Sequence, residues 1–514
     1  MKKLPIVFFI FACCCLGAQD FGFGSADDSA SSAASSPASS SSVKVGGDIT
    51  VELSPYARDF KKNNGTQEIS PWDMISGSLN FSAGNSNIEA YAAFNLNADS
   101  INELRDRNQK LDDPTYTPLI IDEAYLKAYV GPVNIEAGLR KLSWGKADSL
   151  GPLDITNPLD YSDLRNITDI RSIKIARPML HVTWNAGSFS KLEGVFIPNF
   201  AGHRFAEDGR WQPSQVKNMS STIGSGISSM AAIKFAPLLV SNPALIPLFT
   251  GVQNNLLSSV NEFSVNYPPT GALENYQAGL RYTTTIGSAD IGGQYFYGHL
   301  FRPSFTLSGV DAFLDDLAAG VLGAYPPMVN PDYQANISLI SPVIKYNRYH
   351  QIGVDYAQVL FGFNVRAEFA VHITEDLSGD DGSVQNPFIG WSAGFDRDLI
   401  WGINLNIQCN ETVRLFNDKI GTNPILDAEA DTNAVSTRLT MRLSKSFFMD
   451  KLESSATVIY DVENSDYYII PSLKWTEGNM SWKLAGGIFA GKETGELGQY
   501  WQNNYVKFGV TYSF

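Results

Sequence analysis

The chain has few cysteines, and their positions do not suit cross-linking. Three of the four lie at Cys13 to Cys15, and Cys409 stands alone in the rest of the sequence. A disulfide framework needs pairs of cysteines, and a thiolate metal site needs several with defined spacing. The five histidines are scattered, without the HExxH spacing of a zinc site. We therefore predict no disulfide, no metal site and no cofactor.

Long hydrophobic runs are absent after the first residues. The apolar stretch Leu4–Cys15 is too short to cross a bilayer as a helix. Lys2 and Lys3 precede it, and the small residues Gly17-Ala18 follow it, as in an export signal. The sequence therefore predicts a signal peptide at 1–18.

The N-terminus could be processed in either of two ways, and a polar segment follows it. Residues 10–13 (IFAC) loosely resemble a lipoprotein cleavage site, so a lipidated N-terminus is the alternative to simple cleavage. Residues 19–42 are rich in Ser and Ala and have little apolar content, which predicts a disordered tether. We assign the remainder, 43–514, to one domain.

Basic residues are too few for a nucleic-acid partner. Lys and Arg number 38 against 53 Asp and Glu, which gives a net charge of −15. Nucleic-acid binding needs a basic surface, so we exclude that class of partner. In a pore, excess carboxylate would favour cations if it lined the constriction, whereas on outer loops it would serve only solubility.

The sequence does contain recurrent alternation of apolar and polar residues. A period of two predicts a strand with one apolar and one polar face. It starts at Val43–Leu53 and recurs to the last residues, Val506–Phe514. The terminal residues Phe508, Val510, Tyr512 and Phe514 resemble the targeting strand of bacterial outer-membrane barrels, which implies recognition by the barrel-assembly machinery. The alternative is the closing strand of a soluble β-sandwich.

Short turns alternate with longer connections along the whole chain. The short ones fall at 84–86, 131–132, 186–188, 287–288, 358–361, 397–399, 447–451 and 477–478. Eight hairpins plus a first and a last strand predict about 18 strands, with 16 the next alternative. We therefore expect an all-β fold: a transmembrane antiparallel β-barrel in the bacterial outer membrane, with both termini periplasmic and short helices in the long outer loops.

One long connection contains an apolar segment, 217–258, that is nearly free of charge. Its helical spacing is interrupted by Pro237, Pro243 and Pro247, which predicts short helices. Such a segment must be covered, either by other loops or at the barrel mouth or lumen. It could therefore be simple packing or a hydrophobic lining for an apolar solute.

Charged residues also fall on the predicted inner faces of the strands. A charge on the lipid face costs ~2–4 kcal/mol at mid-depth, so these side chains must point inward and line the pore. They could create a transverse field across the pore, or form ion pairs that stiffen the wall. The seven are Glu123, Lys127, Glu136, Arg140, Arg281, Arg366 and Glu368. No nucleophile with a base and an orienting group stands out, so we predict no catalytic residues and no enzyme.

The region 122–164 contains an E-A-Y triplet, a hairpin, then G-x-R-x-x-x-W-G-x-A-D and finally N-P-x-D. These positions are Glu123, Ala124, Tyr125, Gly138, Arg140, Trp144, Gly145, Asp148, Asn157, Pro158 and Asp160. The pattern resembles a family of large bacterial outer-membrane β-barrels known only as a domain of unknown function. The resemblance extends more loosely over most of 43–514. It implies a barrel with an envelope role and supplies no solute.

The second half of this pattern predicts a structured loop base. Trp144 would anchor at the membrane interface and Gly145 would turn the chain, and Asp148 ends the W-G-x-A-D part of the pattern. Asn157-Pro158 and Asp160 would fix the loop through local hydrogen bonds. A loop held in this way could fold inward and narrow the pore, or be a brace without contact to solute.

These features together predict a porin-like channel for small solutes across the outer membrane. Its partners would be membrane lipid, the solutes and the barrel-assembly machinery. One alternative is a transport barrel for a hydrophobic molecule that uses 217–258. Another is a surface adhesin or antigen in which the barrel is only an anchor.

Overall fold

The structure is a computed structural model of the chain. It describes residues 42–58, 74–97, 100, 120–206, 208–218, 230–237, 239–247, 250, 270–308, 341–420, 429 and 432–514. The predicted signal peptide, 1–18, lies outside the described residues, and so does the predicted tether apart from Ser42.

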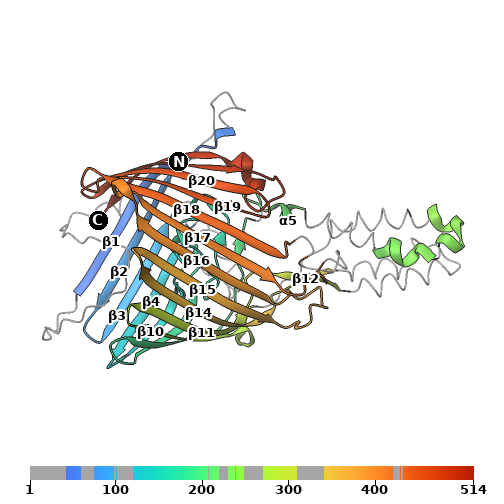
Figure 1. Ribbon diagram of the computed structural model, residues 1–514, viewed down its shortest axis with the longest axis horizontal. Helices are drawn as coiled ribbons and strands as arrows, with labels where there is room; N and C mark the ends of the chain where they lie inside the picture. The colour runs from blue at the N-terminus through green and yellow to red at the C-terminus, as the bar shows by residue number, and fades with distance from the viewer. Residues whose placement is uncertain are drawn as a thin grey trace, which may run out of the picture.

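Eighteen antiparallel strands form one closed sheet, as the alternation of the sequence predicts (Figure 1). The wall strands are β1 (Ser42–Leu53), β2 (Ile75–Gly84), β3 (Ile88–Leu96), β4 (Ile121–Val130), β5 (Val133–Arg140), β7 (Arg177–Asn185), β8 (Ser190–Ile197), β10 (Gln277–Ile286), β11 (Ala289–His299), β14 (Arg348–Leu360), β15 (Phe363–Thr374), β16 (Phe388–Asp398), β17 (Asn404–Arg414), β18 (Val435–Phe447), β19 (Leu452–Asp461), β20 (Asp466–Glu477), β21 (Met480–Ala490) and β22 (Tyr505–Ser513). Each pairs with the next in this order, and β22 pairs with β1 to close the ring. The prediction of 18 rather than 16 strands is therefore confirmed.

The first and last strands meet in a full antiparallel ladder. Their register runs from Asp48 opposite Ser513 to Leu53 opposite Phe508. Beyond it, Gly47 and Phe514 exchange backbone hydrogen bonds of 3.0 and 2.9 Å. The final strand thus has a hydrogen-bonded neighbour on each side, β1 and β21, which is what a sheet inside a membrane requires.

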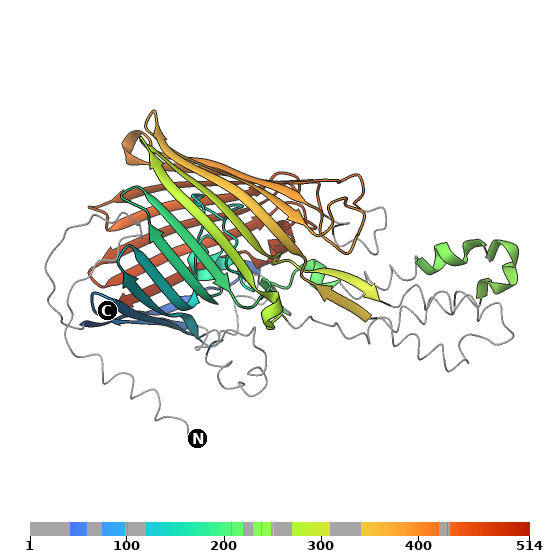
Figure 2. The same ribbon diagram turned by 90° about the horizontal axis from the view of Figure 1, so that it is seen from below.

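Short turns and long connections lie at opposite ends of the barrel (Figure 2). The C-terminus lies at the short-turn end, where Ser513 donates its N–H to the carbonyl of Asn479 in the β20–β21 turn at 2.9 Å. All eight expected short turns join consecutive wall strands. Because the strands are antiparallel, β1 begins at this same end.

The two faces of the wall differ in accessibility as the period of two requires. On β22, Val506 and Phe508 are 52% and 49% exposed, whereas Tyr505 and Lys507 are 3% and 6% exposed. The first pair belongs to the outward face and the second to the inward face. The outer wall is therefore apolar, and the polar positions face the lumen.

The remaining elements are short, and most lie in the connections at the long-loop end. They are the strands β6 (Asp160–Tyr161), β9 (Arg204–Phe205), β12 (Ser304–Ser308) and β13 (Ser341–Lys345), and the helices η3 (Leu164–Asn166), α4 (Ile170–Ile173), α5 (Ser214–Lys217), η4 (Pro243–Leu245), η6 (Leu273–Asn275), η8 (Ile400–Gly402) and η9 (Gly498–Asn503). Among the described residues, no helix is long and apolar enough to cross a membrane.

The apolar segment 217–258 is helical where the structure describes it, for example at 230–237. Figures 1 and 2 both show these helical pieces, in green, projecting beyond the long-loop end and away from the ring of strands. The expectation of short helices is confirmed. The described pieces do not enter the lumen, and the rest of the segment lies outside the described residues.

Two apolar clusters pack inside the ring, between the wall and the inward-folded connections. The first comprises Leu142, Trp144, Met179, Val195, Ile197, Phe296, Leu300 and Tyr349. The second comprises Leu164, Trp211, Ile459, Tyr468, Phe489, Leu497, Tyr500 and Tyr505. Each joins residues of the β5–β7 connection to a different part of the wall, so that connection is held inside the barrel at two places.

Candidate functional site: a loop that crosses the lumen

The connection 141–176 between β5 and β7 is closed at its base by one side chain. Asn157 accepts a hydrogen bond from the N–H of Leu142 at 2.8 Å. Its amide group donates to the carbonyls of Arg140 and Ile175 at 2.8 and 2.9 Å. Asn157 is 2% exposed, so water does not compete for these bonds. The two ends of the loop are therefore tied together where it leaves the wall.

A carboxylate on β15 is the seat for the tip of this loop. Glu368 accepts hydrogen bonds from the backbone N–H groups of Lys146, of Ala147 at 2.7 Å and of Leu153 at 3.3 Å. A side chain at Gly145 or Gly151 would collide with the same carboxylate. Gly145 also has a φ of +101°, which other residues rarely adopt. The loop sequence thus permits close approach of its backbone to Glu368.

A second anchor lies on β17 and joins the loop through its acidic residue. Gln408 accepts the N–H groups of Asp148 and Ser149 at 2.8 and 2.9 Å. The carboxylate of Asp148 accepts from Arg366 at 2.6 Å and from Asn406 at 2.8 Å. Both the backbone and the side chain of Asp148 are therefore held by the wall.

A glutamine pair on β11 and β14 completes this contact. Gln294 and Gln351 are hydrogen-bonded to each other at 2.7 Å. They donate to the carbonyls of Leu153 and Pro152 at 3.0 and 2.6 Å. Leu153 itself is fully buried. Residues 145–153 are consequently fastened to the inner face of the wall from β11 to β17.

Trp144 lies inside the barrel, so the prediction that it anchors at the membrane interface is wrong. It is 3% exposed and packs edge-on against Phe296 of β11, with ring centroids 6.4 Å apart. The inward fold of the loop gives the indole an apolar environment within the first cluster. That environment replaces the membrane interface, where indole rings otherwise gather.

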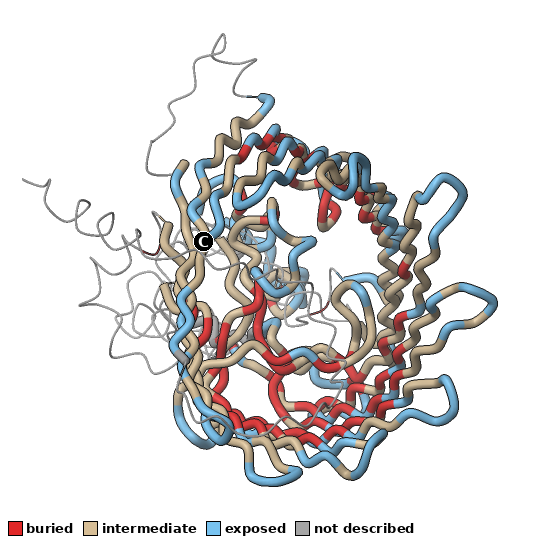
Figure 3. Tube along the Cα trace, turned by 90° about the vertical axis from the view of Figure 1, so that its left-hand side faces the viewer, coloured by how far each residue is buried: buried red, intermediate tan, exposed pale blue. Residues whose placement is uncertain are grey.

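The later part of the same connection contacts the opposite stretch of wall. Tyr468 and Tyr505 are hydrogen-bonded to each other at 2.8 Å, and their hydroxyl oxygens lie 3.4 and 3.3 Å from the carbonyl oxygens of Leu164 and Arg165. Lys507 reaches Asn166 at 3.3 Å. The connection therefore touches the wall between β11 and β17 and again between β20 and β22. Figure 3 shows buried chain segments lying within the ring of strands.

A belt of charge follows the inner wall on neighbouring strands. Glu136 on β5 pairs with Lys127 at 3.2 Å, with Arg140, and with His181 at 2.9 Å. His181 also lies 3.4 Å from Glu193 on β8. Opposite charges on adjacent inner positions thus compensate one another along the wall.

The belt continues to β14 through a buried guanidinium. Arg281 pairs with Asp355 at 2.6 Å and donates to Gln294 at 2.7 Å. The side chains of Arg281 and Asp355 are 4% and 0% exposed. Gln294 links this belt to the loop tip.

The seven inner-face charges predicted from sequence therefore differ in their environments. Arg366 and Lys127 keep 28% and 27% of their side chains exposed. Glu123 is 1% exposed and is covered by Arg171, which donates to it at 2.7 Å. Glu136, Arg140, Arg281 and Glu368 are enclosed by the pairs and the loop contacts described above.

Asp160 and Pro158 belong to the return path of the loop. Asp160 accepts from the N–H of Ser162 at 2.9 Å and from Arg204 at 3.0 Å. The carbonyl of Pro158 accepts the N–H of Ile175 at 2.9 Å. The predicted role of these residues in local hydrogen bonding matches their positions in the structure.

Sequence reasoning missed His203, which fixes the loop from outside the motif. Its Nδ1 accepts the N–H of Leu159 at 2.9 Å, and its ring meets Tyr161 edge-on with centroids 5.2 Å apart. Burial, assisted by the nearby charge of Arg302, lowers the pKa of His203 to about 3. The imidazole is therefore neutral at ordinary pH and can accept this bond. No local pattern in the sequence indicates such a partner.

A row of lysines on β20–β22 was also missed. Lys474 lies directly opposite Lys483 in the register, and Lys507 follows on β22. Lys507 pairs with Glu52 at 2.9 Å. Among the described residues, Lys474 and Lys483 have no ion-pair partner, and both are exposed on inward-facing positions. The inner-face rule that selected the other charges applies equally to them.

The loops carry two further charge contacts. Lys174 bonds to Asp154 at 2.7 Å and to the carbonyl of Leu142 at 2.9 Å. Burial raises the pKa of Asp154, although the ammonium of Lys174 opposes this shift. Across the mouth, Arg438 and Arg302 lower the pKa of Glu496 to about 2. These contacts brace loops from different hairpins against one another.

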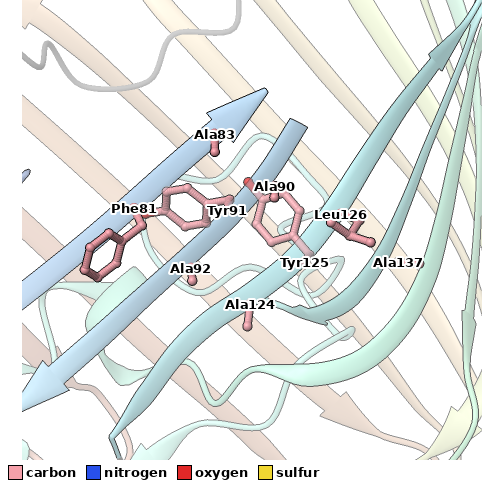
Figure 4. Close-up of a pocket in the computed structure, with 9 residues that line it drawn as sticks. All are labelled: Phe81, Ala83, Ala90, Tyr91, Ala92, Ala124, Tyr125, Leu126 and Ala137. Atoms are coloured by element: carbon pink, nitrogen blue, oxygen red, sulfur yellow. The ribbon is translucent and has the colours of Figure 1, made fainter. Parts of the chain in front are cut away.

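A groove of about 340 Å³ lies on the wall formed by β2–β5, and most of its lining belongs to outward-facing positions. Figure 4 shows its lining, which is mainly alanine: Phe81, Ala83, Ala90, Tyr91, Ala92, Ala124, Tyr125, Leu126 and Ala137. Leu126 is 58% exposed there, as an outward side chain should be. This groove is therefore separate from the lumen. Within the described residues, no cluster of His, Cys, Asp and Glu is suited to a metal ion.

Comparison with known proteins finds similarity only among solved structures. No family model matches it, and no curated protein matches it. Among solved structures, OccK11 (OpdR) of Pseudomonas aeruginosa is similar at a TM-score of 0.41 and 8% identity, covering 92% of this chain and 96% of that one. OccK3 (OpdO) of the same organism scores 0.42 at 8% identity, covering 92% and 95%. A BenF-like porin from Pseudomonas fluorescens scores 0.42 at 9% identity, covering 92% and 98%.

Proposed function

We propose that this protein is an outer-membrane channel for small solutes, porin-like in operation, whose passage is set by the loop 141–176. The observation that carries the proposal is the double attachment of that loop, to β11–β17 and to β20–β22, across the inside of a closed barrel. A rigid loop at that position divides the lumen and limits the size of a solute. Polar and charged side chains line the remaining path.

The outer wall supports the membrane location. Large apolar side chains at outward positions are exposed around much of the ring, for example Val45 at 55%, Leu280 at 57% and Val354 at 53%. Exposure of this kind is stable in lipid and costly in water. In the outer membrane, the short-turn end would face the periplasm, so both ends of the barrel domain would be periplasmic. The barrel-assembly machinery would then recognise β22 together with the terminal Phe514.

The motif shared with the family of unknown function fits this proposal. Glu123 is covered by Arg171, Asn157 closes the base of the loop, and Asp148 joins the tip to the wall. We propose that the family pattern encodes this internal loop. A channel rather than an enzyme is the function we propose.

Planar-bilayer recording of the purified, folded protein tests the proposal. We expect discrete conductance steps, and larger steps when residues 145–153 are replaced by a short Gly-Ser linker. Heat-modifiable gel mobility would establish that both proteins are folded barrels. Absence of steps from folded wild-type protein would overturn the channel assignment. Equal steps from the two proteins would overturn the role of the loop.

No observation favours the other two functions. The described helical pieces of 217–258 project away from the lumen, so they do not form a greasy path through it. In the parts of the long connections that the structure describes, no feature selects a host ligand.

A further inference from the structure

Three neighbouring short turns carry bulky apolar side chains at their tips. They join β14 to β15, β16 to β17, and β18 to β19, which are consecutive in the ring. Phe361 is 96% exposed, Trp401 77% and Met449 93%. Ile400 and Phe448 beside them are 71% and 65% exposed. We call these five residues the turn ridge.

The backbone conformation of the turn ridge is unfavourable for bulky side chains. Phe361, Trp401 and Met449 have φ values of +53°, +63° and +55°. Glycine and asparagine are the residues that normally occupy such positions in tight hairpins. Bulky side chains there are rare and strained. An apolar side chain that is both strained and solvent-exposed gains nothing from the folded barrel alone, so its contact must lie outside the chain.

Other short turns at the same end are built differently. The β2–β3 turn is Asn85-Ser86-Asn87, the β10–β11 turn is Gly287-Ser288, and the β20–β21 turn is Gly478-Asn479. A single aromatic, Phe189, lies at the β7–β8 turn, and the polar β10–β11 turn separates it from the ridge. The ridge therefore makes one side of the short-turn end apolar.

The outer wall directly behind the ridge continues the same surface. Phe448 lies 5.9 Å from the ring of Trp475 on β20. Outward-facing Phe363 and Phe395 meet edge-on at 5.3 Å. The ridge is thus continuous with the lipid-facing wall rather than isolated at the tips of the turns.

Cations accompany these rings. Arg397 lies over the ring of Phe363 at 4.4 Å, and Lys445 lies over Phe447 at 4.9 Å. Among the described residues, neither cation has an ion-pair partner. Aromatic rings with long cationic side chains beside them suit the boundary between acyl chains and anionic phosphate groups.

We infer that the turn ridge is inserted into the phospholipid leaflet at the short-turn end, so that the β14–β19 side of the barrel sits deeper in that leaflet than the rest. Arg397 and Lys445 bind the lipid phosphates. This inference rests on the proposed membrane-spanning function, and it adds a lipid-binding surface and a tilt that a channel as such does not require.

Spin labels test the inference in the full chain, folded in vesicles of phosphatidylethanolamine and phosphatidylglycerol. Labels would be placed singly at Phe361→Cys and Met449→Cys in a background in which Cys13, Cys14, Cys15 and Cys409 are replaced by Ser. Ser86→Cys and Ser288→Cys are matched controls in polar turns, and Val354→Cys on the outer wall of β14 is the membrane control. Access of each label to oxygen, which partitions into lipid, is compared with access to a water-soluble nickel complex.

We expect the ridge labels to resemble Val354 and the polar-turn labels to be open to nickel. Ridge labels as open to nickel as Ser86 would overturn the inference. Ridge labels shielded from both reagents would indicate a protein contact and would also overturn it. An aqueous result at Val354 itself would remove the membrane placement, and with it the proposed function, which separates the two failures.

The native side chain gives a second measurement. The fluorescence difference between wild-type protein and Trp401→Phe reports on Trp401 alone. We expect lipids brominated near the headgroup to quench this component, whereas quenching by iodide alone would contradict insertion. Because Phe retains the bulk and aromatic character of Trp, this variant does not depend on refolding an altered turn.

Discussion

The carboxylate of Glu368 accepts a hydrogen bond from the N–H of Ala147 at 2.7 Å, although 221 residues separate them in the chain. Glu368 belongs to the wall and Ala147 to the loop that crosses the lumen. The same carboxylate also receives the N–H groups of Lys146 and Leu153. Among the described residues no cation pairs with Glu368, so backbone donors stabilise its charge. One side chain thus determines where the loop rests.

Replacing Glu368 with Gln should loosen the tip of the loop. The amide keeps one acceptor oxygen but loses the charge and the second acceptor, and the cost of such losses in buried sites is ~1–3 kcal/mol. We expect larger and noisier single-channel conductance in a barrel that still folds. Glu477→Gln at the short-turn end removes a carboxylate without touching the loop, and its conductance should match the wild type. Unchanged traces for Glu368→Gln would show that the seat is not needed.

Replacing Asn157 with Ala should release the base of the loop instead. Three hydrogen bonds to the backbone disappear, and two carbonyls and one N–H are left without their buried partner. Net values near 1 kcal/mol for each bond predict a loss of about 3 kcal/mol in local stability. Amide hydrogen exchange in the peptide containing Leu142 should accelerate by two orders of magnitude or more. Asn479→Ala, in a turn at the other end of the barrel, is the control. Equal amide protection in the wild type and both variants would contradict the role of Asn157 in holding the base of the loop.

The strand pattern could be predicted from the sequence because it depends on local chemistry alone. Each wall strand has one face in lipid and one in the lumen, so the period of two reports the fold directly. Gly131, Gly287 and Gly478 adopt positive φ at short turns, where glycine is the residue that local sterics favour. Strand number, order and facing followed from those two signals.

The loop contacts could not be predicted, because no local pattern encodes them. Asp148 and Gln408 lie 260 residues apart and meet only once the barrel is closed. The motif indicates that Trp144 and Asn157 are important, but it does not indicate which residues they contact. Trp144 was misplaced because two apolar environments were possible, the membrane boundary and the packed interior beside Phe296, and only the three-dimensional path selects between them.

Acidification should detach the loop through His203. Its pKa in the fold is about 3, below the value of about 6.5 in an unfolded chain, because burial disfavours the cation. The stability that depends on neutral His203 is therefore complete above about pH 6.5 and is lost as the pH falls toward 3. Protonation of Nδ1 would also break its bond with the N–H of Leu159.

Conductance recorded between pH 7 and pH 4 measures this effect. Wild-type channels should become noisier and more conductive as the pH falls. His203→Gln keeps an acceptor that does not titrate in this range, so its traces should change much less. Identical pH profiles for the two proteins would assign the effect to other groups.

The lysine row on β20–β22 should set the ion preference of the channel. Lys474 and Lys483 face each other across neighbouring strands on the inner wall, and within the described part of the chain neither has a carboxylate partner. Opposite them, the charges of the belt from β4 to β14 are largely paired, so the unpaired lysines dominate the local field. This field favours anions even though the chain as a whole carries a net charge of −15.

Lys474→Gln/Lys483→Gln should therefore raise the permeability ratio of potassium to chloride roughly two-fold or more, measured as a shift in reversal potential in a salt gradient. Lys451→Gln removes one cation at a short turn, where it pairs with Glu477 at 2.8 Å, and should leave the ratio unchanged. The shift should shrink in molar salt, because the screening length falls to about 3 Å there. A double variant with the ratio of the wild type would show that the row lies off the conduction path.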